Sequence, residues 1–170
     1  MDLKSKIREV PDFPKKGILF YDITTLLQDP DALSEMITRL SSPFITQQIQ
    51  KVVAVESRGF IFGAPIAQQL HAGFVPVRKP GKLPYKTIQE SYQLEYGVDQ
   101  LTIHEDAISK GERVLIVDDL LATGGTLFAT VNLVRKLGGV VIGIALLIEL
   151  LGLKGRERLP GIPITSLLTY

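Results

Sequence analysis

The chain has 170 residues, of which 45% are hydrophobic and 22% are charged, so it is long enough for one globular domain with a substantial core. Its formal net charge of +1 gives no overall field that would attract nucleic acid or an anionic membrane, so anion binding must come from local clusters. The absence of cysteine excludes disulfides, thiolate catalysis and Cys-based zinc sites.

Two helices and a short extended segment are predicted in the N-terminal part of the chain. Leu3, Ile7 and Val10 recur at helical spacing, which predicts a short amphipathic helix. An extended piece over residues 17–21 follows. The sequence Asp-Pro-Asp at 29–31 then signals the start of a longer helix, whose apolar face continues to about residue 44.

The next stretch predicts a strand, a helix and a second strand, followed by a loop. Residues 52–55 form a short apolar run that ends at Glu-Ser-Arg-Gly, and residues 60–70 follow as a helix. Residues 73–77 are again typical of a strand. Residues 78–91 combine basic residues, prolines and a glycine without a clear period, so we expect a mobile loop there.

A hairpin is predicted after this loop. Tyr92, Leu94 and Tyr96 alternate with polar residues, which indicates a half-buried strand. Residues 101–103, Leu-Thr-Ile, are its expected partner. We therefore expect an antiparallel insertion here, with the mobile loop and the hairpin together covering about residues 78–106.

The C-terminal half alternates strands and helices. Strands are predicted at 113–117 and 140–148 with a helix at 126–137 between them, and a helical turn at 154–159 precedes a last strand at 164–168. Such alternation favours an α/β fold with a doubly wound central parallel sheet flanked by helices. We see no linker, so residues 1–170 are expected to form a single domain.

The sequence also gives an expectation for the cellular location of the protein. The N-terminus is charged and lacks the apolar core of a signal peptide. The longest apolar run, residues 140–148, is too short for a membrane helix. We therefore expect a cytoplasmic protein, with neither nucleic acid nor membrane as a partner.

The most informative segment is residues 114–126, Val-Leu-Ile-Val-Asp-Asp-Leu-Leu-Ala-Thr-Gly-Gly-Thr. A buried strand runs into two carboxylates, Asp118 and Asp119, and then into a glycine-containing loop at the start of a helix. In open α/β sheets ligands bind beyond the carboxyl ends of strands, and a helix N-terminus with free N–H groups favours phosphate. A sugar phosphate fits this pattern, with its hydroxyls on the carboxylates and its phosphate on the loop.

Two common phosphate-binding motifs do not match this segment. A Walker loop needs Gly-Lys-Ser/Thr, and the dinucleotide fingerprint needs three glycines at set spacing; both are absent. An ordinary strand-to-helix turn with an acidic cap stays open. Because side chains alternate along a strand, both Asp residues face one site only if the chain leaves the strand at Val117, and we expect that it does.

This segment resembles the phosphoribosyl-pyrophosphate motif of the type I phosphoribosyltransferases, and residues 120–126 are similar to the adenine branch of that family. Further similar segments occur in the same order along nearly the whole chain. They are Pro-Asp-Phe-Pro at 11–14, Glu-Ser-Arg-Gly-Phe at 56–60, Arg-Lys-Pro-Gly-Lys-Leu-Pro at 78–84, Leu-Glu-Tyr-Gly at 94–97, Glu-Leu at 149–150 and Leu-Lys-Gly-Arg-Glu at 153–157.

The resemblance implies a purine salvage enzyme. It would transfer phosphoribose from phosphoribosyl pyrophosphate to adenine, giving AMP and pyrophosphate, with Mg²⁺ held mainly by substrate oxygens near the Asp pair. It also implies a homodimer and a small hood built from about residues 1–30. The ribose hydroxyls would bind Asp118 and Asp119, and the 5′-phosphate would bind the loop residues Ala122, Thr123, Gly124, Gly125 and Thr126.

The pyrophosphate end of the substrate needs positive charge. Ser57, Arg58 and Gly59 follow a predicted strand, and Arg58 offers a two-pronged grip on phosphate oxygens and counts among the catalytic candidates. A basic cluster on the predicted loop is either a solvated surface or a second pyrophosphate contact, and the resemblance favours the contact. Its members are Arg78, Lys79, Lys82 and Lys86.

The base side of the site rests on the resemblance. The similar Leu-Glu-Tyr-Gly segment assigns Glu95 as the acid or base for the purine, with Tyr96 near the reacting centre. Phe20 and Leu150 would form the walls of the adenine site. Main-chain groups of Leu19 and Tyr21 would recognise the edge of the base.

Two rival functions remain open. The same reaction on a 6-oxopurine would need a donor beside the base, often Lys, and none stands at the Phe20 or Leu150 positions. A sensor that binds phosphoribosyl pyrophosphate and regulates nucleic acid would need a basic recognition surface. The balanced charge and the intact segment around Glu95 argue against the sensor.

Overall fold

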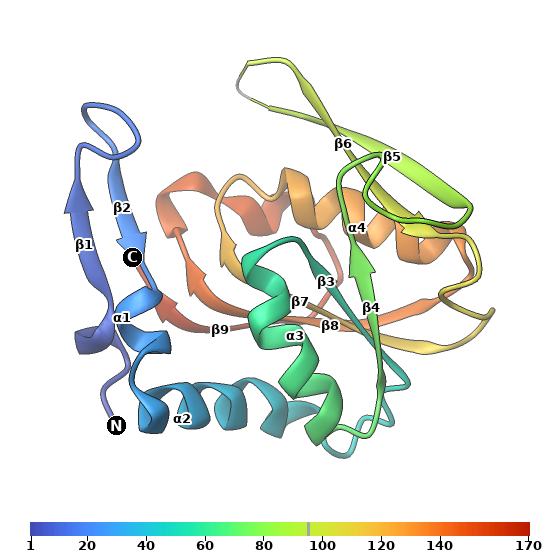
Figure 1. The fold of residues 1–170 in the computed structure, drawn as a ribbon, viewed down its shortest axis with the longest axis horizontal. Helices are drawn as coiled ribbons and strands as arrows, with labels where there is room; N and C mark the ends of the chain where they lie inside the picture. The colour runs from blue at the N-terminus through green and yellow to red at the C-terminus, as the bar shows by residue number, and fades with distance from the viewer. Residues whose placement is uncertain (95) are drawn as a thin grey trace. The chain divides into compact units, whose positions relative to one another are not determined.

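A computed structural model of the chain describes residues 1–94 and 96–170, which divide into two compact units, Met1–Arg39 and Leu40–Tyr170. The predicted catalytic residue Glu95 lies outside the described residues. The second unit holds the central sheet and the helices that cover it (Figure 1).

In the first unit, an antiparallel strand pair takes the place of the predicted N-terminal helix. A short 3-10 helix, η1 (Lys4–Lys6), precedes β1 (Arg8–Pro11), which pairs along its whole length with β2 (Leu19–Asp22). The predicted helix is therefore wrong, although Leu3 is buried as the pattern required. Pairing with β2 gives the backbone of β1 its hydrogen-bond partners in extended form, and this outweighs a weak helical spacing.

The predicted helix after Asp29 is confirmed. The four-residue helix α1 (Thr24–Leu27) is followed by α2 (Pro30–Ser41), and a 3-10 turn, η2 (Ser42–Phe44), continues to the end of the apolar face. The Asp29 carboxylate accepts hydrogen bonds from the backbone N–H groups of Asp31 at 3.0 Å and Ala32 at 3.1 Å. Asp29 thus satisfies donors that the first turn of a helix leaves without partners.

The core of the second unit is a five-stranded parallel sheet of order β4-β3-β7-β8-β9. The chain leaves the sheet after β3, returns as β4 at one edge, and later adds β8 and β9 on the other side of β7. This order confirms the predicted doubly wound α/β fold. The strands are β3 (Lys51–Val55), β4 (Gly73–Val77), β7 (Arg113–Leu121), β8 (Val140–Glu149) and β9 (Ile164–Thr169).

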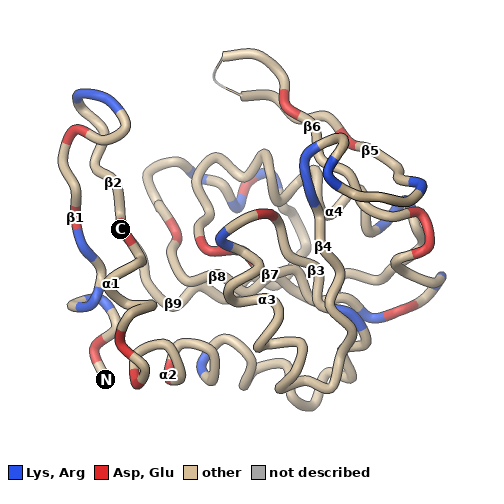
Figure 2. The backbone as a smooth tube through the Cα atoms, viewed as in Figure 1, with Lys and Arg blue, Asp and Glu red and all other residues tan. Residues whose placement is uncertain are grey.

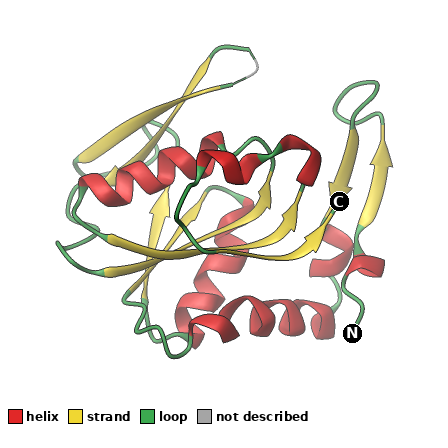
Figure 3. Cartoon of the chain, turned by 180° about the vertical axis from the view of Figure 1, so that it is seen from behind, coloured by secondary structure: helices red, strands yellow, loops and turns green. Residues whose placement is uncertain are grey.

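Helices cover both faces of the sheet. Helix α3 (Arg58–Gln69) is in front of the sheet in Figure 1, and α4 (Gly125–Lys136) is in front in Figure 3, which shows the opposite side. Alternate sheet residues such as Val53, Ile116 and Ile144 join the apolar cluster under α4. Residues 52–55 of β3, 114–117 of β7 and 143–148 of β8 are therefore all buried, as the continuous apolar runs in the sequence predict.

The hairpin β5 (Thr87–Gln93) and β6 (Val98–His104) packs against α4. It confirms the antiparallel insertion, but β5 begins inside the segment predicted as a loop. The alternation of apolar and polar residues that would reveal β5 in the sequence is interrupted, because Glu90 occupies one of the inward positions. Glu90 contacts α4 through Lys136 Nζ at 2.5 Å and Asn132 Nδ2 at 3.3 Å. An inward carboxylate with these partners cannot be distinguished from a surface residue in the sequence.

Two short 3-10 turns, η3 (Leu151–Leu153) and η4 (Gly155–Arg158), connect β8 to β9. They confirm the helical turn predicted at 154–159. Within the described ranges, the helices are too short or too polar to cross a membrane.

Candidate active site

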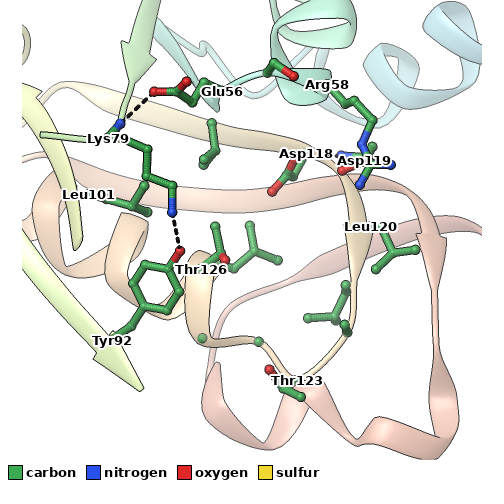
Figure 4. A pocket seen from close by; sticks show the side chains of 17 residues that line it. Glu56, Arg58, Lys79, Tyr92, Leu101, Asp118, Asp119, Leu120, Thr123 and Thr126 are labelled. Carbon is green, nitrogen blue, oxygen red and sulfur yellow. Dashed lines mark hydrogen bonds and ion pairs between the residues drawn. The ribbon is translucent and has the colours of Figure 1, made fainter. Parts of the chain in front are cut away.

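A cavity of about 330 Å³ opens at the carboxyl ends of β3 and β7 (Figure 4). It brings together the turn after β3, the end of β7 and the start of α4, which are far apart in the sequence. Ligands of open α/β sheets bind at this edge, so its position agrees with the sequence prediction. The predicted site residues that line it are Ser57, Arg58, Lys79, Asp118, Asp119, Ala122, Thr123, Gly124, Gly125 and Thr126.

Strand β7 does not end at Val117 as predicted. It continues to Leu121 and keeps its pairing with β8, whereas its last pair with β3 is Val117 with Ala54. Beyond Val117 the β3 side of the strand therefore has no neighbouring strand, and the cavity occupies that space. Asp118 and Asp119 both line the cavity because it is open at this edge, and the chain need not leave the sheet.

The Asp118 carboxyl group is in an environment that disfavours its charge. It is 9% exposed and lies next to Asp119, which is 7% exposed. Burial and the neighbouring carboxylate raise the pKa of Asp118 well above its usual range. Its main local compensation is a hydrogen bond of 2.9 Å that its Oδ1 accepts from the backbone N–H of Asp119. The site therefore holds negative charge that a cation or hydroxyl donors would stabilise.

The turn after β3 places Arg58 against the acidic pair. Arg58 Nε lies 2.8 Å from Asp119 Oδ2, and the peptide bond between Glu56 and Ser57 is cis. Gly59 packs directly over β7: a Cβ at this position would lie 3.0 Å from Asp118 Oδ1 and 3.3 Å from the Val117 carbonyl oxygen. A larger residue than glycine at 59 would therefore displace the carboxylate from its present position.

The loop before α4 has the geometry of an anion site. Gly124 occupies the N-cap in the left-handed conformation, with φ of 84°, which L side chains rarely adopt. Its carbonyl oxygen accepts the first helical hydrogen bond, from Phe128 N–H at 2.9 Å. The N–H groups of the first turn and the helix dipole favour an anion beside Ala122 to Thr126.

Lys79 spans the opposite wall of the cavity. Its backbone N–H donates to Glu56 Oε1 at 2.7 Å, and its ammonium group donates to the Tyr92 hydroxyl at 3.2 Å (Figure 4). The ammonium group also donates to the Asp99 carboxylate. Although partial burial opposes the charged form, the contacts with Asp99 and Tyr92 raise the pKa of Lys79. The ammonium group is therefore positively charged, and it lies where the hairpin residues Tyr92 and Leu101 line the cavity.

Several predicted pyrophosphate residues lie outside the cavity lining. The basic segment after β4 runs beside the hairpin (Figure 2), where Arg78 forms a backbone bridge with Thr102 and its Nε lies 3.4 Å from Glu56 Oε1. Lys82 and Gly59 are also outside the lining.

Tyr96, which the resemblance places near the reacting centre, does not line the cavity either. Its side chain is 80% exposed beyond the end of β5.

Sequence reasoning did not assign seven of the lining residues, which are Val55, Glu56, Tyr92, Leu101, Leu120, Leu121 and Leu127. Several of them adjoin predicted site residues in the sequence, and this adjacency was the available signal. Tyr92 and Leu101 face the cavity only because the hairpin packs over α4, and no local pattern reports that contact.

The predicted adenine residues lie in both units. Leu150 follows β8 directly, and its N–H donates to the Leu121 carbonyl at 3.0 Å, which ties it to the end of β7. In the first unit, β2 carries Leu19, Phe20 and Tyr21; Leu19 is 42% exposed, and the Phe20 ring packs edge-on against Phe13.

The paired carboxylates also fit Mg²⁺, which prefers oxygen ligands and keeps much of its water. Across residues 1–94 and 96–170, no group of three or more His, Cys, Asp or Glu side chains is arranged to hold a metal ion. The raised pKa of Asp118 reflects crowded negative charge that a divalent cation would relieve. The donor chemistry therefore suits a cation shared with substrate oxygens.

Similarity to known proteins extends over the whole chain. Residues 22–160 match the phosphoribosyl transferase domain family. The adenine phosphoribosyltransferase of Acidobacterium capsulatum is 58% identical over 99% of this chain and 93% of the relative. The crystal structure of the Thermoanaerobacter pseudethanolicus enzyme of the same name superposes with a TM-score of 0.96 at 53% identity, covering 99% and 98% of the two chains.

A more distant solved structure has ligands in its description. It is the adenine phosphoribosyltransferase of Trypanosoma brucei in complex with AMP, pyrophosphate and ribose-5-phosphate, with a TM-score of 0.90 and 27% identity over 98% of this chain and 78% of that one. The strand-acid-loop-helix site and this similarity lead to one conclusion: the chain belongs to the type I phosphoribosyltransferase family, in its adenine phosphoribosyltransferase branch.

Proposed function

We propose that the chain transfers the 5-phosphoribosyl group from phosphoribosyl pyrophosphate to adenine, giving AMP and pyrophosphate in purine salvage. The observation that carries this proposal is the cavity in which Asp118 and Asp119 adjoin the N-terminus of α4. Two hydroxyl acceptors next to a phosphate-binding loop suit a ribose 5-phosphate. The T. brucei relative, which was solved with AMP, pyrophosphate and ribose-5-phosphate, supports the same reaction.

The chemical step is a substitution at the anomeric carbon of ribose. An imidazole nitrogen of adenine forms the new bond to this carbon while the bond to pyrophosphate breaks, and its electron pair leaves with pyrophosphate. The nitrogen loses its proton, and we assign Glu95 as the group that accepts it, with Tyr96 nearby. Because positive charge develops on the ribose ring, positioning and electrostatic stabilisation carry most of the catalysis.

Each end of the sugar substrate has its own residues. Asp118 and Asp119 accept hydrogen bonds from the ribose hydroxyls, and the backbone N–H groups of residues 122–126 bind the 5′-phosphate. Arg58 and Lys79 face the same cavity and stabilise the departing pyrophosphate, with Ser57 at the cis turn. Gly59, Arg78 and Lys82 complete the proposed pyrophosphate set.

Mg²⁺ is the proposed cofactor. It would be held by substrate oxygens with Asp118 and Asp119 on the protein side, and when bound it supplies positive charge to the pyrophosphate oxygens. The adenine residues implied by the resemblance, Leu19, Phe20, Tyr21 and Leu150, remain the proposed contacts of the base. The active form is proposed to be a homodimer.

The test is to mix the protein with Mg²⁺, phosphoribosyl pyrophosphate and each purine in turn, and to detect nucleotide by chromatography. AMP from adenine is the expected product, with little nucleotide from hypoxanthine, guanine or xanthine. Nucleotide from guanine and none from adenine would contradict the assignment of the base.

A sensor without catalytic activity is distinguished by one variant. Glu95→Gln should lower turnover by about 10²- to 10⁴-fold, the usual contribution of a positioned acid or base, while ribose 5-phosphate still binds. Full activity in this variant would remove Glu95 from the mechanism.

A further inference from the structure

The connection after β8 is held by a buried carboxylate outside the cavity lining. Glu149, 4% exposed, receives two hydrogen bonds from the Arg156 guanidinium, Nε to Oε1 at 2.6 Å and Nη2 to Oε2 at 2.7 Å. The Ser166 hydroxyl donates to the same Oε2 at 2.6 Å, and Arg156 Nη1 donates to the Ile164 carbonyl at 3.2 Å. This fork ties the η4 turn to the last residue of β8 and to Ile164 and Ser166 in the first half of β9.

The residue next to Arg156 forms the floor of the phosphate loop. Gly155 is buried, and a Cβ placed on it would lie 2.5 Å from Leu121 Cδ1 and closer still to the Ala122 carbonyl oxygen. From the other side, a Cβ on Gly124 would lie 2.6 Å from the Gly155 carbonyl oxygen. Backbone thus packs directly on backbone, so the position of Gly155 sets the position of residues 122–124.

We propose that Arg156, held by Glu149 and Ser166, is a positioning residue that fixes the phosphate loop through Gly155 and thereby sets the affinity for the 5′-phosphate of the sugar. This inference rests on the proposed function, because it concerns the same phosphate subsite. Arg156 does not line the cavity, and its guanidinium group is bound to Glu149, which also lies outside the lining. It therefore acts through the loop and makes no contact with the substrate.

The chemistry of the fork suits this role. A planar guanidinium bound at two points fixes both the distance and the angle of the η4 turn, which a lysine ammonium cannot do. The Arg156 guanidinium and the Ser166 hydroxyl hold the pKa of Glu149 below its usual range, so the pair stays charged at neutral pH. Backbone N–H groups bind phosphate at short range, and a small displacement of the loop misaligns them.

The first experiment compares wild type with Arg156→Lys by calorimetric titration with ribose 5-phosphate and, separately, with inorganic pyrophosphate. Ribose 5-phosphate should bind about 10- to 100-fold more weakly to the variant, since small misplacements of binding groups have effects of this size. Pyrophosphate, assigned to Arg58 and Lys79, should bind equally well. The KM for phosphoribosyl pyrophosphate should rise more than kcat falls. Arg39→Lys, in the exposed pair with Glu35, is the matched control and should match wild type.

A second pair of variants tests the contact itself. Gly155→Ala inserts a methyl group between the turn and the loop, whereas Gly152→Ala, in the same connection, adds a methyl group with no atom within 4 Å. Gly155→Ala should weaken ribose 5-phosphate binding as Arg156→Lys does, and Gly152→Ala should leave it unchanged. All titrations are made below the melting temperature of each variant, checked by circular dichroism.

The outcomes separate this inference from the function on which it rests. Equal binding of ribose 5-phosphate by wild type, Arg156→Lys and Gly155→Ala would overturn the positioning role and leave the proposed function intact. An equal loss for ribose 5-phosphate and pyrophosphate would also overturn it, because the fork would then have only a general structural role. Failure of wild type to bind ribose 5-phosphate would overturn the proposed function and this inference together.

Discussion

Asp118 illustrates how a binding residue can oppose stability at the scale of single side chains. Its buried carboxyl group has a raised pKa because burial and Asp119 disfavour its charge, and one backbone hydrogen bond offsets this only in part. The ribose hydroxyls and the cation proposed here would supply the missing compensation. The substrate-free protein therefore retains an unfavourable group for the sake of binding.

Replacing this carboxylate tests the argument. Asp118→Asn keeps an oxygen that accepts the Asp119 N–H but removes the buried charge, so the free energy of unfolding without substrate should rise by about 1 kcal/mol. Ribose 5-phosphate binding should weaken about 10- to 100-fold, because a hydrogen bond to a charged acceptor is lost. Urea denaturation and calorimetry measure the two effects.

Asp119→Asn is the comparison for this variant. Asp119 pairs with Arg58 at 2.8 Å, so the neutral side chain of the variant loses this ion pair and should not stabilise the fold. Destabilisation by Asp118→Asn without substrate would show that the buried charge is already well compensated.

The part of the site whose residues follow one another in the sequence could be predicted. Asp118, Asp119 and residues 122–126 form one run, and parallel strands place such runs at one sheet edge. Lys79 was expected on the cavity from the resemblance, but its partners Tyr92 and Asp99 were not, because they come from the folded hairpin. Contacts of this kind depend on packing between elements, which a single sequence does not report.

At the scale of elements, α3 lies very close to β3. A Cβ on Gly63 would lie 2.6 Å from Ala54 Cβ and 2.9 Å from Phe74 Cε2. The glycine lets the helix lie directly on the strand, where the Ala54 side chain is fully buried and Phe74 is partly exposed.

Gly63→Ala should therefore destabilise the protein by about 1–3 kcal/mol through overpacking, even though alanine is the better helix former. Ala54→Gly in the same chain removes one of the two clashing atoms and should restore part of the loss, and urea denaturation of all four combinations measures that coupling. Additive effects of the two substitutions would mean that α3 moves away from β3 at little cost.

Elements with strong local signals were predicted well, and those decided by their partners were not. The apolar runs of β3, β4 and β8 and the helix stop at Gly138, where φ is 88°, match the sequence prediction closely. Strand β1 was predicted as a helix because pairing with β2 is invisible in its own residues. The extension of β7 to Leu121 was missed because its β8 partner continues while β3 ends.

For the molecule as a whole, the Glu149–Arg156 pair should make stability depend on pH. The pKa of Glu149 is lowered in the folded state, mainly by Arg156, so the unfolded chain binds a proton more readily. The stabilisation is present above the ordinary glutamate pKa of 4.5 and is lost as pH falls through the lowered value. The raised pKa of Asp118 has the opposite sign, so the two contributions oppose each other in acid.

Glu149→Gln separates the two contributions. At neutral pH it should lower the free energy of unfolding by about 1–3 kcal/mol, the value of hydrogen bonds to a charged group, and the difference from wild type should shrink as pH falls below 4.5. Urea denaturation at a series of pH values gives both curves. A constant difference across the range would contradict the assignment of the lowered pKa to this pair.

The central claim is that residues 118–126 bind a sugar phosphate through both its ribose hydroxyls and its phosphate oxygens. A crystal structure of the protein with AMP and Mg²⁺ tests it most directly. We predict the phosphate at the backbone N–H groups of residues 122–126 and the ribose hydroxyls at Asp118 and Asp119. Clear density for AMP elsewhere, with the turn between β7 and α4 unoccupied, would contradict the account.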